Sequence, residues 1–421
     1  MKTKTRFIGG FIMHYNTIVI GGGPAGLFAA QKLGRAQKHV LLLERNSVAG
    51  RKLLISGAGQ CNFTHAGPIE DFFDCYDDKI KFLKKALTTF TNKDTMHFFE
   101  TAGVDYQVFP NNKVFPKSMK SRDILDALLL KCQKANVEFA YNETVDNISV
   151  YDDIFTVETQ SGKRYFSDQV VIATGGKSYP HMGSDGLGYT LAEKLGHTIV
   201  TPRPALTDIR TIEKQYKVLS GLSTKEAEIT IWRENKKVTT YVGDLLFTHK
   251  GLSGPAIINS SRWMYPGDVV TVNFLYPQTH ESVKTYFAEH LAHRGKEEVI
   301  TFLKQFKLPR NLYAVLCENI GLDEHLPCAQ VNKKQREQLV QMLTKCPFHI
   351  ETLGGFHIAM VTTGGVKLKE VNPTSMESRK QKGVYFIGEV LDVDGDTGGY
   401  NIQAAFSTGY LCAKHIIEKS Q

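Results

Sequence analysis

The sequence predicts an α/β fold in which one discontinuous domain is interrupted by an insert. Short apolar strands and helical patterns alternate at both ends of the chain, and glycine-rich turns follow the strands. Between these ends, alternating strands come first and polar helical segments follow. We therefore expect the first domain to span 14–198 and 350–421. The insert would comprise a β-rich part, 199–277, and a helical part, 278–349.

The first domain opens with a strand–helix–strand unit, predicted at residues 16–20, 24–34 and 39–44. The turn carries Gly21, Gly23 and Gly26 in a Gly-x-Gly-x-x-Gly pattern. The first glycine permits a tight turn, the second lets a pyrophosphate approach the backbone, and the third lets the helix pack closely on the strand. Pro24 and Ala25 open the helix, whose free amides attract phosphate. This unit predicts a dinucleotide site.

Other residues of the first domain extend this prediction. Glu44 and Arg45 end the second strand, where a carboxylate can accept hydrogen bonds from ribose hydroxyls. A buried strand, 169–174, returns and ends in Ala173, Thr174 and Gly175. Val145 precedes a small meander, where a backbone contact with adenine is usual, although an ordinary core position explains this valine equally well.

The C-terminal segment indicates which dinucleotide binds. An apolar strand ends in Gly388-Glu389, and a glycine-rich turn then opens a helix. In FAD proteins the acid of such a pair binds the ribityl chain, and the helix dipole stabilises reduced flavin. A dehydrogenase that binds only NAD has no need of this second acid and helix. We therefore expect FAD, with the helix contributing Gly399, Asn401, Ile402 and Gln403.

The loop GRKLLISGAGQCNFT, residues 50–64, follows the second strand directly and can run along the pyrophosphate towards the flavin. Its small residues allow close approach, and its basic side chains can face phosphate or the flavin pyrimidine. The candidates in this loop are Arg51, Lys52, Ser56, Gly57, Gln60, Cys61 and Asn62. A redox role for Cys61 is less favoured than close packing at the flavin, because no second cysteine lies nearby.

The remaining first-domain segments are predicted from their periodicity. They are a helical stretch at 78–102, a hairpin at 104–116 that turns at Asn111-Asn112, a helix at 121–135 and an antiparallel meander at 137–166. Residues 1–13 precede the first strand and are expected to form a disordered extension.

Four further blocks carry a resemblance to a known family. They are ATGGKSYPHMGSDGLGYTLAEKLGHTIV, GDLLFTHKGLSGPAIINSS, TTGGVKLKEVNPTSMES and GEVLDVDGDTGGYNIQAAFSTG. Together with the 50–64 loop, the chain resembles the BaiN-like FAD-binding flavoproteins, the aminoacetone oxidase family of NAD(P)/FAD-dependent oxidoreductases. The resemblance covers residues 14–417. It implies a glutathione-reductase-like FAD domain of Rossmann type with an inserted β-barrel-plus-helical domain, and non-covalent FAD at the positions named above.

Two departures from that family concern the loops near the cofactor. Relatives more often read Ser-Gly-Gly-Gly-Arg-Cys-Asn, whereas Ala58 and Gln60 replace a glycine and the arginine here. The run Gly183–Gly188 reads Gly-Ser-Asp-Gly-Leu-Gly instead of Gly-Ser-Thr-Gly-Asp-Gly. Substrate choice or redox tuning is therefore expected to differ from that of relatives.

Composition narrows the cellular setting and the partners. The net charge of +8 is spread along the chain without an interleaved basic–aromatic run, so a nucleic-acid partner is not expected. The seven cysteines are scattered and lack a Cys-x-x-Cys pair, which argues against a disulfide framework or a zinc site. A reducing cytoplasm and no metal are therefore expected. No apolar run is long enough for a membrane span.

The predicted reaction is hydride transfer through flavin N5 from NAD(P)H to a small organic acceptor of the enone type. A second Gly-x-Gly-x-x-Gly unit is missing from the sequence, so a nicotinamide would bind only transiently. Candidate proton donors are Tyr400, Tyr179, His249 and Cys61. Three alternatives stay open: an amine or hydroxy-acid oxidase, a flavin-containing RNA-binding protein, and a non-catalytic redox sensor.

Overall fold

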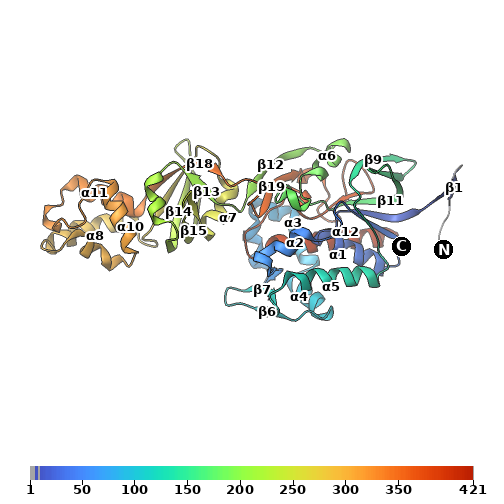
Figure 1. Cartoon of the computed structure of the whole chain (residues 1–421), viewed down its shortest axis with the longest axis horizontal. Helices are drawn as coiled ribbons and strands as arrows, with labels where there is room; N and C mark the ends of the chain where they lie inside the picture. The colour runs from blue at the N-terminus through green and yellow to red at the C-terminus, as the bar shows by residue number, and fades with distance from the viewer. Residues whose placement is uncertain (1–4, 8–9, 421) are drawn as a thin grey trace. The chain divides into compact units, whose positions relative to one another are not determined.

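The computed structural model describes residues 5–7 and 10–420. The chain divides into two compact units. The first unit combines Met1–Arg203 with Met360–Gln421, and the second is Pro204–Ala359. Figure 1 shows both ends of the chain, blue and red, within the first unit. The second unit ends later than the predicted return at residue 350, because Cys346–Leu353 continues as a strand, β18, of the second unit.

The first unit is built on a sheet with the strand order β8-β4-β3-β11-β10-β9, in which β20 also pairs with β11. Its strands are β3 (His14–Ile20), β4 (Val40–Glu44), β8 (Glu138–Tyr141), β9 (Val145–Tyr151), β10 (Ile154–Thr159), β11 (Arg164–Ile172) and β20 (Val384–Phe386). β3 lies parallel to both β4 and β11, and β20 is parallel to β11. Every residue of β4 is buried, as expected for a parallel strand covered on both faces.

The predicted meander at 137–166 is partly wrong. Glu138–Tyr141 forms β8, which pairs in parallel with β4 and extends the parallel part of the sheet. This strand follows a crossover helix, and a crossover places the next strand parallel to the first. Only β9, β10 and β11 form the antiparallel meander.

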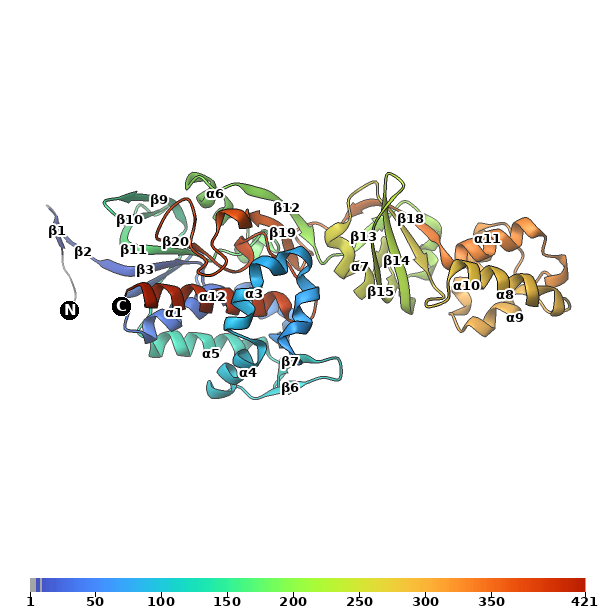
Figure 2. The ribbon, with the colours of Figure 1, turned by 180° about the vertical axis from the view of Figure 1, so that it is seen from behind.

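The helices of the first unit are α1 (Pro24–Arg35), α2 (Arg51–Ile55), α3 (Ile80–Thr89), α4 (Asn92–Thr101), α5 (Ser121–Lys134), α6 (Leu187–Lys194) and α12 (Tyr400–Lys419). α1 packs against β3 and β4 of the sheet, and α6 packs against β9. Figure 2 shows α1, α5 and α12 side by side on one side of the sheet. Leu27, Phe28 and Leu33 of α1 are buried in the shared core. Among the described residues, none of the helices has the length and apolar content that a membrane span requires.

Smaller elements complete the first unit. β5 (Thr64–His65), β7 (Lys113–Pro116) and β6 (Tyr106–Val108) form a separate sheet in that order, with the turn at the predicted Asn111-Asn112. β12 (Ile199–Ala205) pairs with β19 (Val361–Val366). The short helical turns of this unit are η1 (Ser56–Gly59), η2 (Ile69–Lys79), η3 (Pro180–Met182), η8 (Leu368–Glu370) and η9 (Gly388–Val390).

The N-terminal segment, predicted to be a disordered extension, contains a two-stranded ribbon. β1 (Thr5–Phe7) pairs antiparallel with β2 (Gly10–Ile12), so backbone hydrogen bonds replace the expected disorder there. A ribbon of two strands is only marginally stable by itself. Residues 1–4 and 8–9 of the predicted extension lie outside the described residues.

The second unit contains a closed antiparallel barrel in the order β13-β16-β15-β14-β17-β18. Its strands are β13 (Ile209–Thr211), β14 (Ser223–Arg233), β15 (Lys236–Phe247), β16 (Gly251–Ser253), β17 (Val269–Asn273) and β18 (Cys346–Leu353). Alternation along β14 sends Ala227, Ile229 and Ile231 into the barrel core, where all three are fully buried. The α/β class and the inserted barrel are thus confirmed.

Helices follow the barrel strands in the second unit. They are α7 (Pro255–Ser260), α8 (His280–His293), α9 (Val299–Leu303), α10 (Arg310–Asn319) and α11 (Lys333–Thr344). Phe287, Phe302 and Leu339 belong to one buried cluster with the barrel residues Phe247 and Phe348. The barrel and its helices therefore share a core. The short turns here are η4 (Lys214–Leu219), η5 (Ser261–Trp263), η6 (Lys304–Phe306) and η7 (Cys328–Gln330).

Truncating Phe247 tests the barrel core. Its ring is 1% exposed and lies near the rings of Tyr216, Phe274 and Phe348. We expect Phe247→Ala to lower the free energy of unfolding by about 3–5 kcal/mol, because it leaves a cavity. Both tryptophans of the chain, Trp232 and Trp263, lie in the second unit. Urea unfolding followed by tryptophan fluorescence therefore reports on that unit.

The matched control is Val242→Ala on the same strand, where the side chain is 45% exposed. This change should alter stability by about 0.5 kcal/mol or less. Equal effects of the two substitutions would contradict the assigned core.

Candidate flavin site

Backbone contacts explain two of the three glycines in the turn after β3. A Cβ on Gly21, whose φ is +108°, would lie 2.5 Å from the carbonyl oxygen of Ala173. A Cβ on Gly26 would lie 2.0 Å from the carbonyl oxygen of Gly21. Gly23 differs, because no atom lies within 4 Å of its Cβ position. That open side is where a pyrophosphate would need to approach, so the turn fits a dinucleotide.

The first helix is also packed tightly at its start. Pro24 occupies the first turn of α1, where a missing N–H costs nothing. Ala25 is buried, and a Cβ on Gly388 would lie 2.8 Å from the Ala25 Cβ. Two predicted segments, more than 360 residues apart, therefore meet at the start of this helix.

Glu44 lies beside the glycine turn. The Gly22 N–H donates to its Oε2 at 2.8 Å, and the Asn46 N–H and side-chain amide donate to Oε1 at 2.8 and 2.7 Å. A carboxylate has further acceptor sites, so ribose hydroxyls can still be bound. Arg45 forms an ion pair with Asp185 at 2.5 Å. Its guanidinium is therefore partly neutralised.

Lys52 and Glu389 form an ion pair between the two ends of the predicted site. The Lys52 ammonium lies 2.7 Å from Glu389 Oε2, and the Thr362 N–H donates to Oε1 at 2.9 Å. A Cβ on Gly176 would lie 3.1 Å from the same Oε1. Lys52 thus holds the acid predicted to bind the ribityl chain. Arg51 donates to Asn46 Oδ1 at 2.8 Å.

The loop after α2 has an unusual backbone. Gly57, Ala58 and Cys61 have φ values of +56°, +55° and +58°. A side chain in this region costs about 1–2 kcal/mol, which explains why relatives prefer glycine where this chain has Ala58. The loop is closed by hydrogen bonds from Gln60 N–H to the Gly57 carbonyl oxygen and from Cys61 N–H to the Ser56 carbonyl oxygen.

Side chains of this loop point to its neighbours. Ser56 donates to the Leu53 carbonyl oxygen at 2.7 Å, and Asn62 Oδ1 accepts from the Val114 N–H at 3.2 Å. The thiol of Cys61 is fully buried, and burial raises its pKa to about 12. It is therefore protonated at neutral pH, which favours the packing role over the redox role.

The return strand places its end against the glycine turn. The Ala173 N–H donates to the Ile20 carbonyl oxygen at 2.8 Å and extends the β3–β11 pairing. A Cβ on Gly188 would lie 1.9 Å from Thr174 Oγ1, and Gly175 has a φ of +76°. Val145 begins β9 and is 1% exposed, so its side chain belongs to the core.

The start of α12 is fixed by contacts with the segment around β5. A Cβ on Gly399 would lie 2.7 Å from the backbone of Thr64. Gln403 is fully buried and accepts from Thr64 Oγ1 at 2.6 Å. Asn401 exchanges two hydrogen bonds, each 2.8 Å long, with the backbone of Gly395, and Ile402 is half-buried. The Gln403 and Asn401 side chains therefore support the loop, which leaves backbone groups to face a cofactor.

The candidate proton donors are scattered. Tyr400 stacks on His65 at 5.1 Å, and burial raises the pKa of its hydroxyl, with Cys75 as the next contributor. Tyr179 is half-buried at the start of η3. His249 is exposed on the turn between β15 and β16, in the second unit. The structure therefore places Tyr400, Tyr179 and Cys61 in the first unit and His249 in the other.

Sequence reasoning missed two supporting residues. Thr362 Oγ1 accepts from the Lys177 and Ser178 N–H groups at 2.8 and 3.1 Å, and so joins the return loop to Glu389. Asn46 links Glu44 to Arg51. Thr362 lies in the TTGG block that resembles the family, whereas only its position two residues after Glu44 singles out Asn46.

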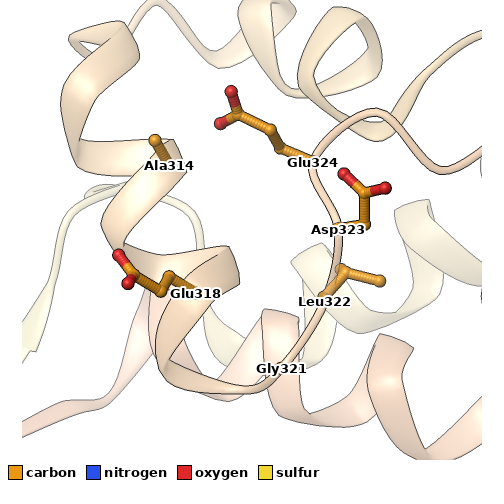
Figure 3. Close-up of a pocket in the computed structure, with 6 residues that line it drawn as sticks. All are labelled: Ala314, Glu318, Gly321, Leu322, Asp323 and Glu324. Atoms are coloured by element: carbon orange, nitrogen blue, oxygen red, sulfur yellow. The ribbon is translucent and has the colours of Figure 1, made fainter.

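A pocket of about 410 Å³ lies in the helical part of the second unit. Figure 3 shows its lining residues on α10 and the following loop, with the Glu318 carboxylate pointing away from Asp323 and Glu324. Three carboxylates make this pocket unsuitable for phosphates. It contains none of the predicted cofactor residues, so it is not the dinucleotide site.

Comparison with known proteins agrees with this geometry. A family model described as the HI0933-like protein Rossmann domain matches residues 15–415. The chain belongs to the HI0933-like family. The resemblance to BaiN-like flavoproteins is thus confirmed, and this HI0933-like protein is an FAD-dependent oxidoreductase.

Curated relatives of this HI0933-like protein match along nearly its whole length. A ribosomal RNA dihydrouridine synthase of Escherichia coli (strain K12) is 32% identical over 96% of this chain and 98% of its own. The enzyme with the same name from Haemophilus influenzae is 31% identical over 95% and 98%. A 3-dehydro-bile acid delta(4,6)-reductase of Clostridium scindens is 29% identical over 95% and 98%.

Solved structures similar to the HI0933-like chain include the open conformation of a flavocytochrome c3 fumarate reductase. It is 16% identical, with a TM-score of 0.48, and the match covers 96% of this chain and 78% of that one. A 3-ketosteroid-delta4-(5alpha)-dehydrogenase from Rhodococcus jostii RHA1 is 14% identical, also with a TM-score of 0.48, over 96% and 97%.

The open side of Gly23 yields a specific prediction. Its φ of −82° suits alanine, so Gly23→Ala should cost about 1 kcal/mol or less in the stability of FAD-free protein. A methyl group pressed against the phosphates should raise the Kd for FAD roughly 5–150-fold, which corresponds to about 1–3 kcal/mol. Flavin fluorescence titration measures the Kd. The control is Gly355→Ala, where space is equally open but the residue lies in the second unit.

The burial of Cys61 predicts its reactivity. In native protein treated with iodoacetamide at pH 8, peptide mass spectrometry should find Cys61 unmodified, because its thiol is enclosed and protonated. The half-buried Cys75 is the internal reference, and unfolded protein should be modified at both. Rapid alkylation of Cys61 in the native protein would contradict this prediction and support a redox role for Cys61.

Proposed function

We propose that this HI0933-like protein reduces a carbon–carbon double bond conjugated with a carbonyl group, and that its substrate is a uracil ring in ribosomal RNA. The observation that carries the proposal is the pair of reactions named for its relatives. In uridine the C5=C6 double bond is conjugated with the C4 carbonyl, and its reduction gives dihydrouridine. The two delta(4,6) double bonds of a 3-oxo steroid are likewise conjugated with the C3 carbonyl. The two substrates differ in structure, but both reactions reduce a carbon–carbon double bond that is conjugated with a carbonyl group.

The overall charge favours the RNA substrate over the steroid. The net charge of +8 and the pI of about 8.9 attract polyanions. The two relatives named for ribosomal RNA are 32% and 31% identical to this chain, and the reductase of the bile acid is 29% identical. A small organic enone is therefore the second candidate acceptor. We propose NAD(P)H as the electron donor for either.

We propose roles for the residues of the candidate site on this basis. When bound, FAD supplies hydride transfer at its N5 atom. The open face of Gly23 and the amides of α1 would hold the pyrophosphate, and Glu44 would orient the ribose. The ion pair with Lys52 fixes the position of Glu389, which would bind the ribityl chain. The Cys61 loop would exclude water by close packing.

The second carbon of the reduced bond needs a proton. Cys61 and Tyr400 are enclosed, whereas Tyr179 is half-buried and follows the Gly175–Ser178 loop that Thr362 joins to Glu389. Among the donors on the first unit we therefore propose Tyr179. Tyr179→Phe should lower kcat about 100-fold or more, in the range typical of a lost general acid, without changing FAD content.

An anaerobic experiment tests the function. Holoprotein is mixed with NADH or NADPH, and absorbance at 450 nm follows flavin reduction. Unmodified ribosomal RNA transcribed in vitro is then added, and nucleoside mass spectrometry measures dihydrouridine. We expect bleaching followed by one new dihydrouridine, with Gly23→Ala protein as the FAD-poor control.

Three results would contradict the proposal. Saturation of a 3-oxo-4,6-diene steroid without any dihydrouridine would favour the small-molecule acceptor. Bleaching by an amine or a hydroxy acid, with none by NAD(P)H, would indicate an oxidase. If the protein consumes none of these electron donors, a non-catalytic redox sensor would be favoured.

A further inference from the structure

The hairpin formed by β6 and β7 carries a concentrated positive charge. Residues 106–120 contain Lys113, Lys117 and Lys120 and no carboxylate. Tyr106 and Phe109 precede Lys113, and Phe115 lies between Lys113 and Lys117. Basic and aromatic side chains thus share one hairpin, although they form no continuous run in the sequence, because they are divided between two strands and their turn.

The strand register places three of these side chains, Phe109, Lys113 and Phe115, on one face. Gln107 pairs with Phe115, so both point to the same side, together with Phe109 and Lys113 two residues away on each strand. Phe109 and Phe115 meet edge to face at 5.2 Å, and Phe109 is 37% exposed. Val114 is fully buried on the opposite side. We call the side formed by Gln107, Phe109, Lys113 and Phe115 the outer face.

The lysines of the hairpin are available for an external anion. Within the described part of the chain, Lys113, Lys117 and Lys120 have no carboxylate partner, and Lys117 and Lys120 are exposed. Lys52 and Lys79 of the same unit are already paired, with Glu389 and Asp392. Uncompensated charge on a fixed hairpin attracts phosphate groups.

The hairpin is tied to the loop that we assign to the flavin. The Phe63 N–H donates to the Val114 carbonyl oxygen at 3.1 Å, and the Ala66 N–H donates to the Asn112 carbonyl oxygen at 2.7 Å. A Cβ on Gly57 would lie 3.6 Å from the Phe115 ring. A ligand on the outer face would thus lie beside the loop of Gly57 and Cys61.

We propose that the outer face and the following lysines bind a single-stranded segment of the RNA substrate and deliver one base to the flavin loop. Lysines would contact backbone phosphates, and the exposed Phe109 ring would stack on a base. The inference rests on the proposed function for the identity of the RNA, and it adds the surface that binds it.

Two variants and a matched control test the surface. The variants are Lys113→Gln/Lys117→Gln/Lys120→Gln and Phe109→Ala, and the control is Lys367→Gln/Lys369→Gln/Lys382→Gln, three exposed lysines between β19 and β20. The probe is a short fluorescein-labelled oligouridylate, and anisotropy gives Kd as a function of salt. Bound-FAD absorbance shows that each variant is folded.

The triple hairpin variant should lose three phosphate contacts. We expect the Kd for the oligouridylate to rise about 100-fold at ~0.1 M salt. A plot of the logarithm of the binding constant against the logarithm of the salt concentration should become less steep by about 2, because each phosphate contact on a single strand contributes about 0.7 to the slope. Phe109→Ala should raise Kd roughly 5–150-fold, whereas Phe109→Tyr should keep the affinity. The control variant should match the wild type.

Unchanged Kd in FAD-replete hairpin variants would overturn the inference. The inference would also be overturned if the hairpin variants lost binding to anionic phospholipid vesicles but kept the wild-type affinity for oligouridylate. The parallel dihydrouridine measurement separates the two proposals. If RNA binding depends on the hairpin but no dihydrouridine forms, only the proposed function is rejected. If the triple lysine variant forms as much dihydrouridine as the wild type, only the RNA-binding role of the hairpin is rejected.

Discussion

The close backbone contact between the turn after β3 and the end of β11 constrains the whole first unit. Gly21 must lie against Ala173, and Gly26 must lie against Gly21, with no room for a side chain at either glycine. This contact fixes the start of α1 above the sheet. A Cβ on Gly409 would in turn lie 2.8 Å from the Ala25 carbonyl oxygen, so α12 is held against α1. The two ends of the chain are thereby locked together around the candidate flavin site.

Charge pairing reinforces this arrangement over long sequence distances. Lys52 pairs with Glu389, and Lys79 pairs with Asp392 at 2.8 Å. Both pairs are partly buried. Separating either pair is unfavourable, because an unpaired buried charge costs several kcal/mol. These pairs position the segments, and the glycine contacts set their spacing.

Sequence reasoning found the features that depend on local spacing. The Gly21–Gly26 pattern, the Gly388-Glu389 strand end and the Asn111-Asn112 turn each follow from neighbours within a few residues. It did not find contacts that need the folded chain, such as the Thr362 link between two loops or the parallel pairing of β8. The roles of Asn401 and Gln403 show the same limit, because the pattern marks their positions but not the direction of their side chains.

The way the chain leaves and rejoins the first unit has an evolutionary consequence. β12 and β19 pair with each other, and β13 pairs with β18, so the outgoing and incoming segments run as neighbours. A domain whose two ends are adjacent can be inserted, lengthened or exchanged without altering its host. The second unit can therefore change in length or sequence while the flavin-binding framework of the first unit stays intact.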